Sequence, residues 1–263
     1  MRFTKMQGLG NDYLYVYGEP PENVAELSRK LSDRHFGAGA DGMIFISPTD
    51  AADFGMRIFN ADGSEAMMCG NGIRCVGKYV YEKGYTDQTN LRIETRSGMR
   101  SLKLHLLGKR VRAVSVEMGF VEVGRAVSLT VGAETVVCTP VSVGNPHAVV
   151  FSENAEAAPV DRLGPALEHH PAFPNGVNVE FVQKTSENQL RMRVWERGSG
   201  ITMACGTGAC ASVAAAVDRR LFPAGVPVSV LLDGGTLTVT IRPDGTVSMS
   251  GPAEFVYEGE TVC

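Results

Sequence analysis

Long apolar segments are absent from this sequence. No run approaches the roughly 20 consecutive apolar residues of a membrane helix, and the opening MRFTKMQGLGND lacks the apolar core of a secretory signal peptide. We therefore expect a protein that does not span a membrane and that works in the cytoplasm. In that reducing compartment the six cysteines are expected to be free thiols rather than a disulfide framework.

The sequence also lacks a concentration of basic residues. Its 25 Lys and Arg are scattered among 29 Asp and Glu, and the formal net charge is −4. Nucleic-acid-binding surfaces normally appear as clusters or stripes of Lys and Arg. This absence argues against a nucleic-acid partner and favours a small molecule.

Strand-like patterns dominate the chain, and helical patterns are few. Most short segments have an apolar residue at every second position, which is typical of strands. The clearest predicted helices cover residues 22–35, 72–83, 160–169 and 207–220. This combination predicts an α+β fold in which mostly antiparallel sheets wrap around a small number of helices.

An internal repeat indicates that the chain is duplicated. FNADGSEAMMCGNGIRC (59–75) aligns with WERGSGITMACGTGACA (195–211) at a constant offset of 136 residues, which pairs Cys69 with Cys205. Farther towards the N-terminus, GND at 10–12 aligns with GNP at 144–146. A shared order of Gly-Asn, Cys-Gly-x-Gly and then a helix predicts two copies of one domain.

The predicted domains are pseudo-symmetric halves, residues 1–117 and 118–263, that face each other across a cleft containing the active site. The chain length of 263 residues suits two domains of about 100 to 150 residues each. The sequence leaves open whether the last strand, near 254–263, returns to the first half.

Cys-Gly-x-Gly precedes a predicted helix in each half. The first N–H groups of a helix have no intrahelical partner, and the helix dipole places partial positive charge there. Such a position lowers the pKa of a thiol and can bind a carboxylate. Two such cysteines predict inversion at a carbon next to a carboxylate, with one sulfur removing a proton and the other returning one on the opposite face. Backbone dipoles can stabilise the developing charge, so no pyridoxal-type cofactor is expected.

Other interpretations of these motifs are weaker. Zinc sites usually separate cysteines by about two to four residues, whereas the spacings here are C-x5-C (Cys69, Cys75) and C-x4-C (Cys205, Cys210); we expect no metal. Cys75 and Cys210 are expected to pack in the core, as a lone buried cysteine usually does. Cys138 and Cys263 show no local chemistry. GAGADG (37–42) matches G-x-G-x-x-G, but it follows a helical pattern and opens no helix, so it predicts a turn rather than a dinucleotide site.

The ordered motifs FNADGSE, MCGNGIRC, GNPH, ERGSG and ACGTGACA resemble those of diaminopimelate epimerases over nearly the whole chain. The resemblance implies that family's fold, a homodimer, and cofactor-independent conversion of LL-diaminopimelate to the meso form for lysine and peptidoglycan precursors. A proline or hydroxyproline epimerase, which shares the two-cysteine plan, is the alternative within this chemistry. Asn71 and the ERG triplet favour diaminopimelate. A non-catalytic amino-acid-binding protein is a third possibility, against which the retention of both cysteines argues.

The resemblance also implies roles for individual residues. Cys69 and Cys205 correspond to the catalytic pair, although the sequence does not tell which rests as the thiolate. The backbone implied to hold the reacting carboxylate belongs to Gly70, Asn71, Gly206 and Thr207, with Asn11 beside it. The residues implied to bind the distant amino-acid end are Asn60, Asn145, Asn178, Glu196 and Arg197. His147 is implied to lie behind the thiols. Gly42 stands where many members carry a glutamine, and Ile201 stands where some carry a glutamate, so both are left out of the predicted site.

Overall fold

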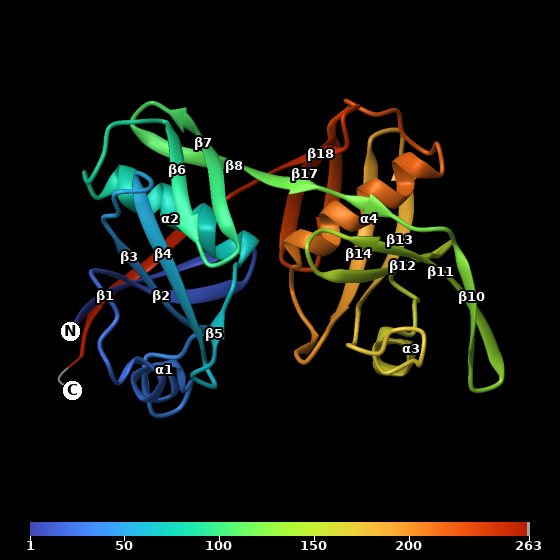
Figure 1. The fold of residues 1–263 in the computed structure, drawn as a ribbon, viewed down its shortest axis with the longest axis horizontal. Helices are drawn as coiled ribbons and strands as arrows, with labels where there is room; N and C mark the ends of the chain where they lie inside the picture. The colour runs from blue at the N-terminus through green and yellow to red at the C-terminus, as the bar shows by residue number, and fades with distance from the viewer. Residues whose placement is uncertain (262–263) are drawn as a thin grey trace. The chain divides into compact units, whose positions relative to one another are not determined.

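The computed structural model describes residues 1–261, which form two compact units. Unit 1 comprises Met1–Val116 together with the described residues from Gly251 onward, and unit 2 comprises Glu117–Ser250. In Figure 1 the chain colours run from blue to green through unit 1 and from green to red through unit 2, before the red C-terminal segment joins the blue strands of unit 1. Cys263 lies outside the described residues.

Unit 1 contains one mixed sheet and two helices. Its strands are β1 (Arg2–Gly8), β2 (Asn11–Tyr17), β3 (Gly42–Ser47), β4 (Phe54–Asn60), β5 (Glu65–Ala66), β6 (Asn90–Thr95), β7 (Gly98–Leu107), β8 (Arg110–Phe120) and β19 (Glu254–Glu260), and its helices are α1 (Val24–Ser32) and α2 (Gly70–Glu82). The sheet order is β19-β1-β2-β3-β4-β6-β7-β8. Only β2–β3 and β4–β6 are parallel among these pairs.

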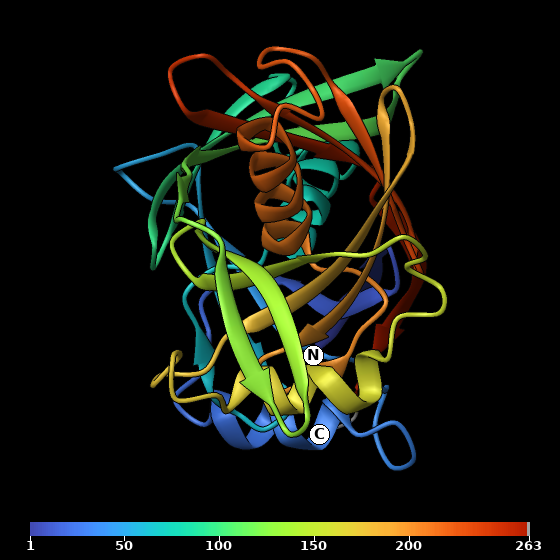
Figure 2. The ribbon, with the colours of Figure 1, turned by 90° about the vertical axis from the view of Figure 1, so that its right-hand side faces the viewer.

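Unit 2 repeats this plan. Its strands are β9 (Glu122–Val123), β10 (Val127–Val131), β11 (Glu134–Ser142), β12 (Pro146–Phe151), β13 (Asn178–Ser186), β14 (Gln189–Glu196), β15 (Gly200–Ile201), β16 (Val228–Leu232), β17 (Gly235–Ile241) and β18 (Thr246–Gly251), and its helices are α3 (Val160–Glu168) and α4 (Gly206–Asp218). The order is β10-β11-β12-β13-β14-β16-β17-β18. Figure 2 turns this unit towards the viewer and shows α3 beside the β10–β11 hairpin, which α3 contacts.

The two topologies correspond strand for strand. The parallel pairs β12–β13 and β14–β16 match β2–β3 and β4–β6, and each unit has one helix between the strands of its first parallel pair and one between those of its second. Helices α1 and α3 begin at Val24 and Val160, and α2 and α4 begin at Gly70 and Gly206. Both helix pairs keep the offset of the sequence repeat. The prediction of a duplicated α+β fold with few helices is confirmed.

One helix of each unit is almost completely enclosed by the sheet. Every residue of α2 from Gly70 to Val80 is buried, including Arg74, whose Nε donates to the Pro252 carbonyl at 3.1 Å. In α4 the enclosed surface is built from small residues, and the helix contacts β9, β16, β17 and the strands from β11 to β14. Because both helices are surrounded along their length, their N-termini are held in fixed positions by the core.

The final strand belongs to unit 1. β19 pairs antiparallel with β1, from Arg2 opposite Glu260 to Gln7 opposite Glu254, with a bulge at Lys5 and Met6. The chain therefore leaves unit 2 at Ser250, and the sheet of unit 1 combines segments from both ends of the sequence. None of the helices in residues 1–261 is long and apolar enough to cross a membrane.

Candidate active site

Cys69 is the N-cap residue of α2. Its backbone is extended (φ −137°, ψ 116°), and its Sγ accepts a hydrogen bond from the Gly72 N–H at 3.3 Å. A cap normally supplies a hydroxyl or carboxylate oxygen to these otherwise unpaired N–H groups. Here a sulfur takes that place at the positive end of the helix, where the dipole stabilises a thiolate.

Cys205 has the same position in unit 2. It caps α4 with φ −117° and ψ 112°, and its Sγ accepts from the Gly208 N–H at 3.3 Å. The glycine three residues after each cysteine allows this approach: a Cβ at Gly208 would lie 3.2 Å from the Cys205 sulfur, and a Cβ at Gly72 would lie 2.7 Å from Cδ1 of Ile44. The repeated Cys-Gly-x-Gly is therefore a thiol cap on an enclosed helix.

Asn11 lies against the Cys69 thiol. The sulfur donates to Asn11 Oδ1 at 3.2 Å, and Asn11 Nδ2 donates to Asp41 Oδ2 at 2.7 Å. Gly70 and Asn71, in the first turn of α2, are buried beside the thiol. The structure thus brings together four of the five site residues that the sequence predicts for unit 1.

A strained two-residue turn places Asn11 at this point. β1 and β2 form a hairpin in which Gly8 pairs with Asn11, and the intervening Leu9 and Gly10 have φ values of 59° and 86°. Positive φ at both central residues gives the turn that matches strand twist in short hairpins, but it is unfavourable for leucine. Leu9 is nevertheless buried, with 5% of its surface exposed. Packing of this side chain holds the turn in place.

Polar groups from α4, from the turn before β12 and from strands β12 and β13 form a connected chain that ends at Cys205. Its Sγ lies 3.6 Å from Thr207 Oγ1, to which Asn145 Nδ2 donates at 3.3 Å. Asn145 Oδ1 in turn contacts His147 Nε2 at 3.1 Å, so a chain of hydrogen bonds leads from the sulfur to a buried histidine. Behind the ring, His147 Nδ1 lies 2.7 Å from Glu180 Oε1.

Burial is the largest of the effects that raise the pKa of the Cys205 thiol. Desolvation, then the carboxylates of Glu196 and Glu180, raise the pKa of this thiol well above its usual value, while hydrogen bonds from Thr207 and Gly208 oppose the shift. Burial likewise raises the pKa of Glu196, whose carboxylate accepts a hydrogen bond from Thr202 and interacts with the Cys205 thiol. Glu196 therefore lies near the thiol, and the contact with the distant end of the substrate that the resemblance implied stays a prediction.

Arg197 and Asn178 form a second polar group in unit 2. The backbone N–H of Arg197 donates to Asn178 Oδ1 at 2.8 Å, and its Nη1 donates to the Asn175 carbonyl at 2.8 Å. Asn178 is buried and Arg197 is exposed. In unit 1, Asn60 ends β4 and donates to Ser64 Oγ at 3.0 Å across a tight turn. Its proposed contact with substrate stays a prediction.

Comparison with known proteins identifies the family. The model of the diaminopimelate epimerase family matches residues 3–123 and 139–256. The chain is 45% identical to diaminopimelate epimerase from Acetivibrio thermocellus, over 99% of this chain and 98% of that protein. It is 50% identical to diaminopimelate epimerase from Phocaeicola vulgatus, with the same coverage of both chains. This chain belongs to the diaminopimelate epimerase family.

The fold is also shared more widely than the family. A phenazine biosynthesis protein of the PhzF family from Bacillus anthracis superposes with a TM-score of 0.80 over 100% of this chain and 99% of its own, at 16% sequence identity. At that identity the likeness shows the fold alone. Membership of the diaminopimelate epimerase family therefore depends on the sequence relatives and the motifs, not on the architecture.

Three residues near the two cysteines of this family member were not predicted from the sequence. Asp41 holds Asn11, Glu180 holds His147, and the buried Tyr13 is close enough to Asn11 and Cys69 to interact with both. Glu180 gave one signal: it is the only charged residue in the otherwise apolar start of the segment NVEFV. Asp41 gave none, because Asp-Gly is an ordinary turn sequence.

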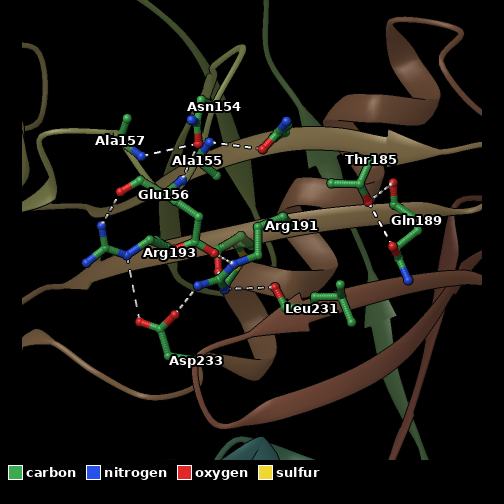
Figure 3. Close-up of polar contacts among 12 residues, drawn as sticks. Asn154, Ala155, Glu156, Ala157, Thr185, Gln189, Arg191, Arg193, Leu231 and Asp233 are labelled. Atoms are coloured by element: carbon green, nitrogen blue, oxygen red, sulfur yellow. Dashed lines mark hydrogen bonds and ion pairs between the residues drawn. The ribbon is translucent and has the colours of Figure 1, made fainter.

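A separate charged cluster in unit 2 contains no nucleophile. Figure 3 shows Arg191 between Asp233 and the Leu231 carbonyl, with Glu156 and Arg193 beside it. Arg191 forms ion pairs with both Glu156 and Asp233. These two carboxylates neutralise the positive charge of Arg191. The cluster therefore joins the loop before α3 to the β16–β17 turn rather than forming an anion site. Among the described residues, no group of His, Cys, Asp and Glu side chains has the geometry to hold a metal ion.

Proposed function

We propose that the protein interconverts LL-diaminopimelate and meso-diaminopimelate by proton transfer at one α carbon, using Cys69 and Cys205 and neither pyridoxal phosphate nor a metal. The observation that carries this proposal is the pair of thiol caps on equivalent enclosed helices. The relatives support the substrate, because proteins 45% and 50% identical to this chain bear the name diaminopimelate epimerase. They do not favour proline or hydroxyproline.

The proposed reaction begins with the substrate carboxylate bound by backbone N–H groups of the first helical turns, those of Gly70, Asn71, Gly206 and Thr207. Helix N-termini suit an anion because their N–H groups are unpaired and their dipole is positive. One cysteine, as thiolate, removes the α proton, and the other, as thiol, gives a proton to the opposite face. The reaction requires both sulfurs within hydrogen-bonding reach of the same carbon. Charge that develops on the carboxylate is stabilised by the same N–H groups.

Glu196 is proposed to assist Cys205 when that cysteine acts as the base. A thiol with a raised pKa is a poor source of thiolate at neutral pH. The neighbouring Glu196 carboxyl interacts with Cys205, and burial raises the pKa of Glu196 as well. A more basic carboxylate can share the thiol proton as the sulfur approaches the substrate. His147 is proposed to orient this region through Asn145 rather than to meet the substrate.

The second amino-acid end of diaminopimelate accounts for the remaining polar residues. Leaving its carboxylate and ammonium buried without partners would cost several kcal/mol. We propose that Asn60, Asn145, Asn178 and Arg197 supply donors to that carboxylate, and that Glu196 or nearby carbonyls receive the ammonium. Proline has no such second end. Location in the cytoplasm and assembly as a homodimer are further proposals that rest on the family resemblance, and size-exclusion chromatography with light scattering would test the second.

Hydrogen exchange in deuterated water tests the function directly. Purified protein without pyridoxal phosphate and treated with a chelator is incubated with LL-diaminopimelate, and both deuterium at the α carbon and the meso product are followed by NMR. We expect turnover of LL- and meso-diaminopimelate and little or none of proline. Cys69→Ala and Cys205→Ala should each lower epimerisation by about 10²- to 10⁴-fold, the usual contribution of one acid or base. Faster racemisation of proline than of diaminopimelate would overturn the assignment.

A further inference from the structure

The hydrogen bonds of Asn11 fix which end of its side-chain amide faces the Cys69 sulfur. We propose that Asp41 is a positioning residue that holds the Asn11 carboxamide with its oxygen towards the sulfur, and thereby keeps Cys69 as the protonated thiol before substrate binds. This inference rests on the proposed two-thiol function and deepens it, because it assigns Cys69 as the proton donor of the resting enzyme.

Asp41 determines which end of the amide faces the sulfur. A carboxylate can only accept hydrogen bonds, whereas an asparagine side chain has a donor end and an acceptor end. Asp41 Oδ2 takes the donor end, Asn11 Nδ2, at 2.7 Å. The acceptor end, Oδ1, is therefore left 3.2 Å from the Cys69 sulfur. Rotating the amide by half a turn would place its oxygen against a carboxylate oxygen, which is strongly unfavourable.

The Asp41 carboxylate is itself held in place. The Asp12 backbone N–H donates to the same oxygen, Oδ2, at 3.0 Å, and Arg34 Nη2 donates to the other oxygen at 2.8 Å. Arg34 also pairs with Asp12 at 2.7 Å, and Lys5 pairs with Asp12 at 2.8 Å. The carboxylate therefore cannot turn away from Asn11 without breaking a connected set of charged hydrogen bonds.

Asn11 stabilises the thiol form of Cys69 and not the thiolate. The bond from Sγ to Asn11 Oδ1 exists only while the sulfur carries hydrogen, and ionisation would bring the lone pairs of Oδ1 against a negative sulfur. The Gly72 N–H acts in the opposite sense, because it donates to the sulfur. Asn11 thus offsets the tendency of the helix N-terminus to ionise its cap.

Other titratable groups also face Cys69 in unit 1. Tyr13 and Tyr15 approach from β2, Cys75 lies one and a half turns along α2, and Arg74 lies beside Cys75. Burial raises the pKa of Cys75 to about 11, so this thiol stays neutral near the active site. The Tyr15 hydroxyl is engaged with the Gly72 carbonyl at 3.2 Å. Asp41 differs from these groups because it orients the amide that contacts the sulfur.

Two substitutions of Asp41 separate amide orientation from charge. Asp41→Asn removes the negative charge, but the Asp12 N–H keeps an oxygen at the Oδ2 position, where it still accepts from Asn11 Nδ2. Asp41→Ala removes both the charge and the acceptor, so the Asn11 amide can turn its donor end towards the sulfur. A donor at that place stabilises the thiolate.

The experiment measures iodoacetamide alkylation of Cys69 against pH in the full-length protein, by mass spectrometry of the Cys69 peptide. We expect Asp41→Ala to lower the apparent pKa of Cys69 by about one unit, equal to a tenfold larger thiolate fraction below that pKa, and Asp41→Asn to stay near the parent. Equal changes in both variants would show that charge alone acts, and no change in Asp41→Ala would show that Asn11 is held otherwise. Either result overturns the proposal.

Two further measurements keep the test independent of folding and of the proposed function. Cys75 should stay unreactive in every variant, which reports an intact unit 1. If Asp41→Ala fails to fold, Asn11→Ala removes the same acceptor and should lower the pKa of Cys69 in the same direction; an unchanged pKa there overturns the proposal. Alkylation does not require epimerisation, so failure of this inference and failure of the proposed function give different results.

Discussion

His147 and Glu180 form a fully buried pair, with Nδ1 of the ring 2.7 Å from Oε1 of the carboxylate and both side chains 0% exposed. Among the described residues, Oε2 of Glu180 has no hydrogen-bond partner. A buried carboxylate with an unused oxygen is costly, and this one lies beside the cap of α4, since a Cβ at Gly208 would come within 2.7 Å of Oε1. Glu180 thus links the histidine to the thiol site.

The first prediction concerns the charge of Glu180. This carboxylate is one of the groups that raise the pKa of Cys205. Because a nearby negative charge disfavours the thiolate, Glu180→Gln should lower the pKa of Cys205. The rate of Cys205 alkylation, which increases with pH as the thiol ionises, should then increase at a lower pH than in the parent. The amide oxygen of glutamine can still accept from the ring, so His147 keeps its position. Glu156→Gln, at an exposed carboxylate of the same unit, should leave the profile unchanged.

The second prediction tests the glycine behind the Cys205 cap. A methyl group at Gly208 would lie 2.7 Å from Glu180 Oε1 and 3.2 Å from the Cys205 sulfur. Gly208→Ala should therefore lower the free energy of unfolding by about 1 to 3 kcal/mol, as overpacking usually does, and should reduce kcat. Gly55→Ala is the matched control, because its added Cβ would meet its nearest neighbour at an ordinary 3.5 Å. Similar denaturation midpoints and activities for the two variants would contradict this account.

Much of this architecture could be predicted from local sequence. Apolar alternation indicated the strands, and the helices predicted over 72–83 and 207–220 begin in the structure at Gly70 and Gly206. The early start has a physical cause: glycine is a poor helix former, but the thiol cap and the enclosing sheet offset that preference. The topology also contains the repeat, because the repeated sequence motifs lie at equivalent helix N-termini and hairpins of the two units.

The contacts that tune the thiols could not be predicted in the same way. Asp41 reaches Asn11 because β3 pairs in parallel with β2, a relationship between segments separated by α1. Glu196 is brought near Cys205 by the short β14–β15 hairpin, in which Glu196 pairs with Gly200. Such contacts depend on register, and register is set by the whole sheet rather than by a motif.

The third prediction concerns the far end of the substrate. Arg197 is held by Asn178 through its backbone N–H and by the Asn175 carbonyl through Nη1, which orients the guanidinium. A planar fork binds a carboxylate through two parallel hydrogen bonds, which lysine cannot reproduce. Arg197→Lys should lower kcat/KM for diaminopimelate by about 10- to 100-fold, the equivalent of a charged hydrogen bond of roughly 1.5 to 3 kcal/mol.

Arg193→Lys serves as the control for that substitution, because Arg193 contacts the Glu156 carbonyl and Asp233 in the separate charged cluster. Its kinetics should match those of the parent. Unchanged turnover by Arg197→Lys in steady-state assays would show that this guanidinium does not bind the substrate.

The last prediction is that oxidation reversibly inactivates the enzyme by forming a Cys69–Cys205 disulfide. The proposed reaction requires both sulfurs to approach one carbon, and thiols that can approach each other form a disulfide readily. The bond needs Cα atoms within about 7 Å of each other, so it should form only if the two units can close on each other. Mild oxidant should therefore remove activity in step with a Cys69–Cys205 cross-linked peptide, and a dithiol reductant should restore it.

Cys75 and Cys210 are fully buried, and neither should appear in a cross-link. Saturating diaminopimelate should slow the cross-linking, because the proposed reaction requires the substrate to bind between the two sulfurs. Full activity in protein that carries the disulfide quantitatively would exclude the two-thiol mechanism.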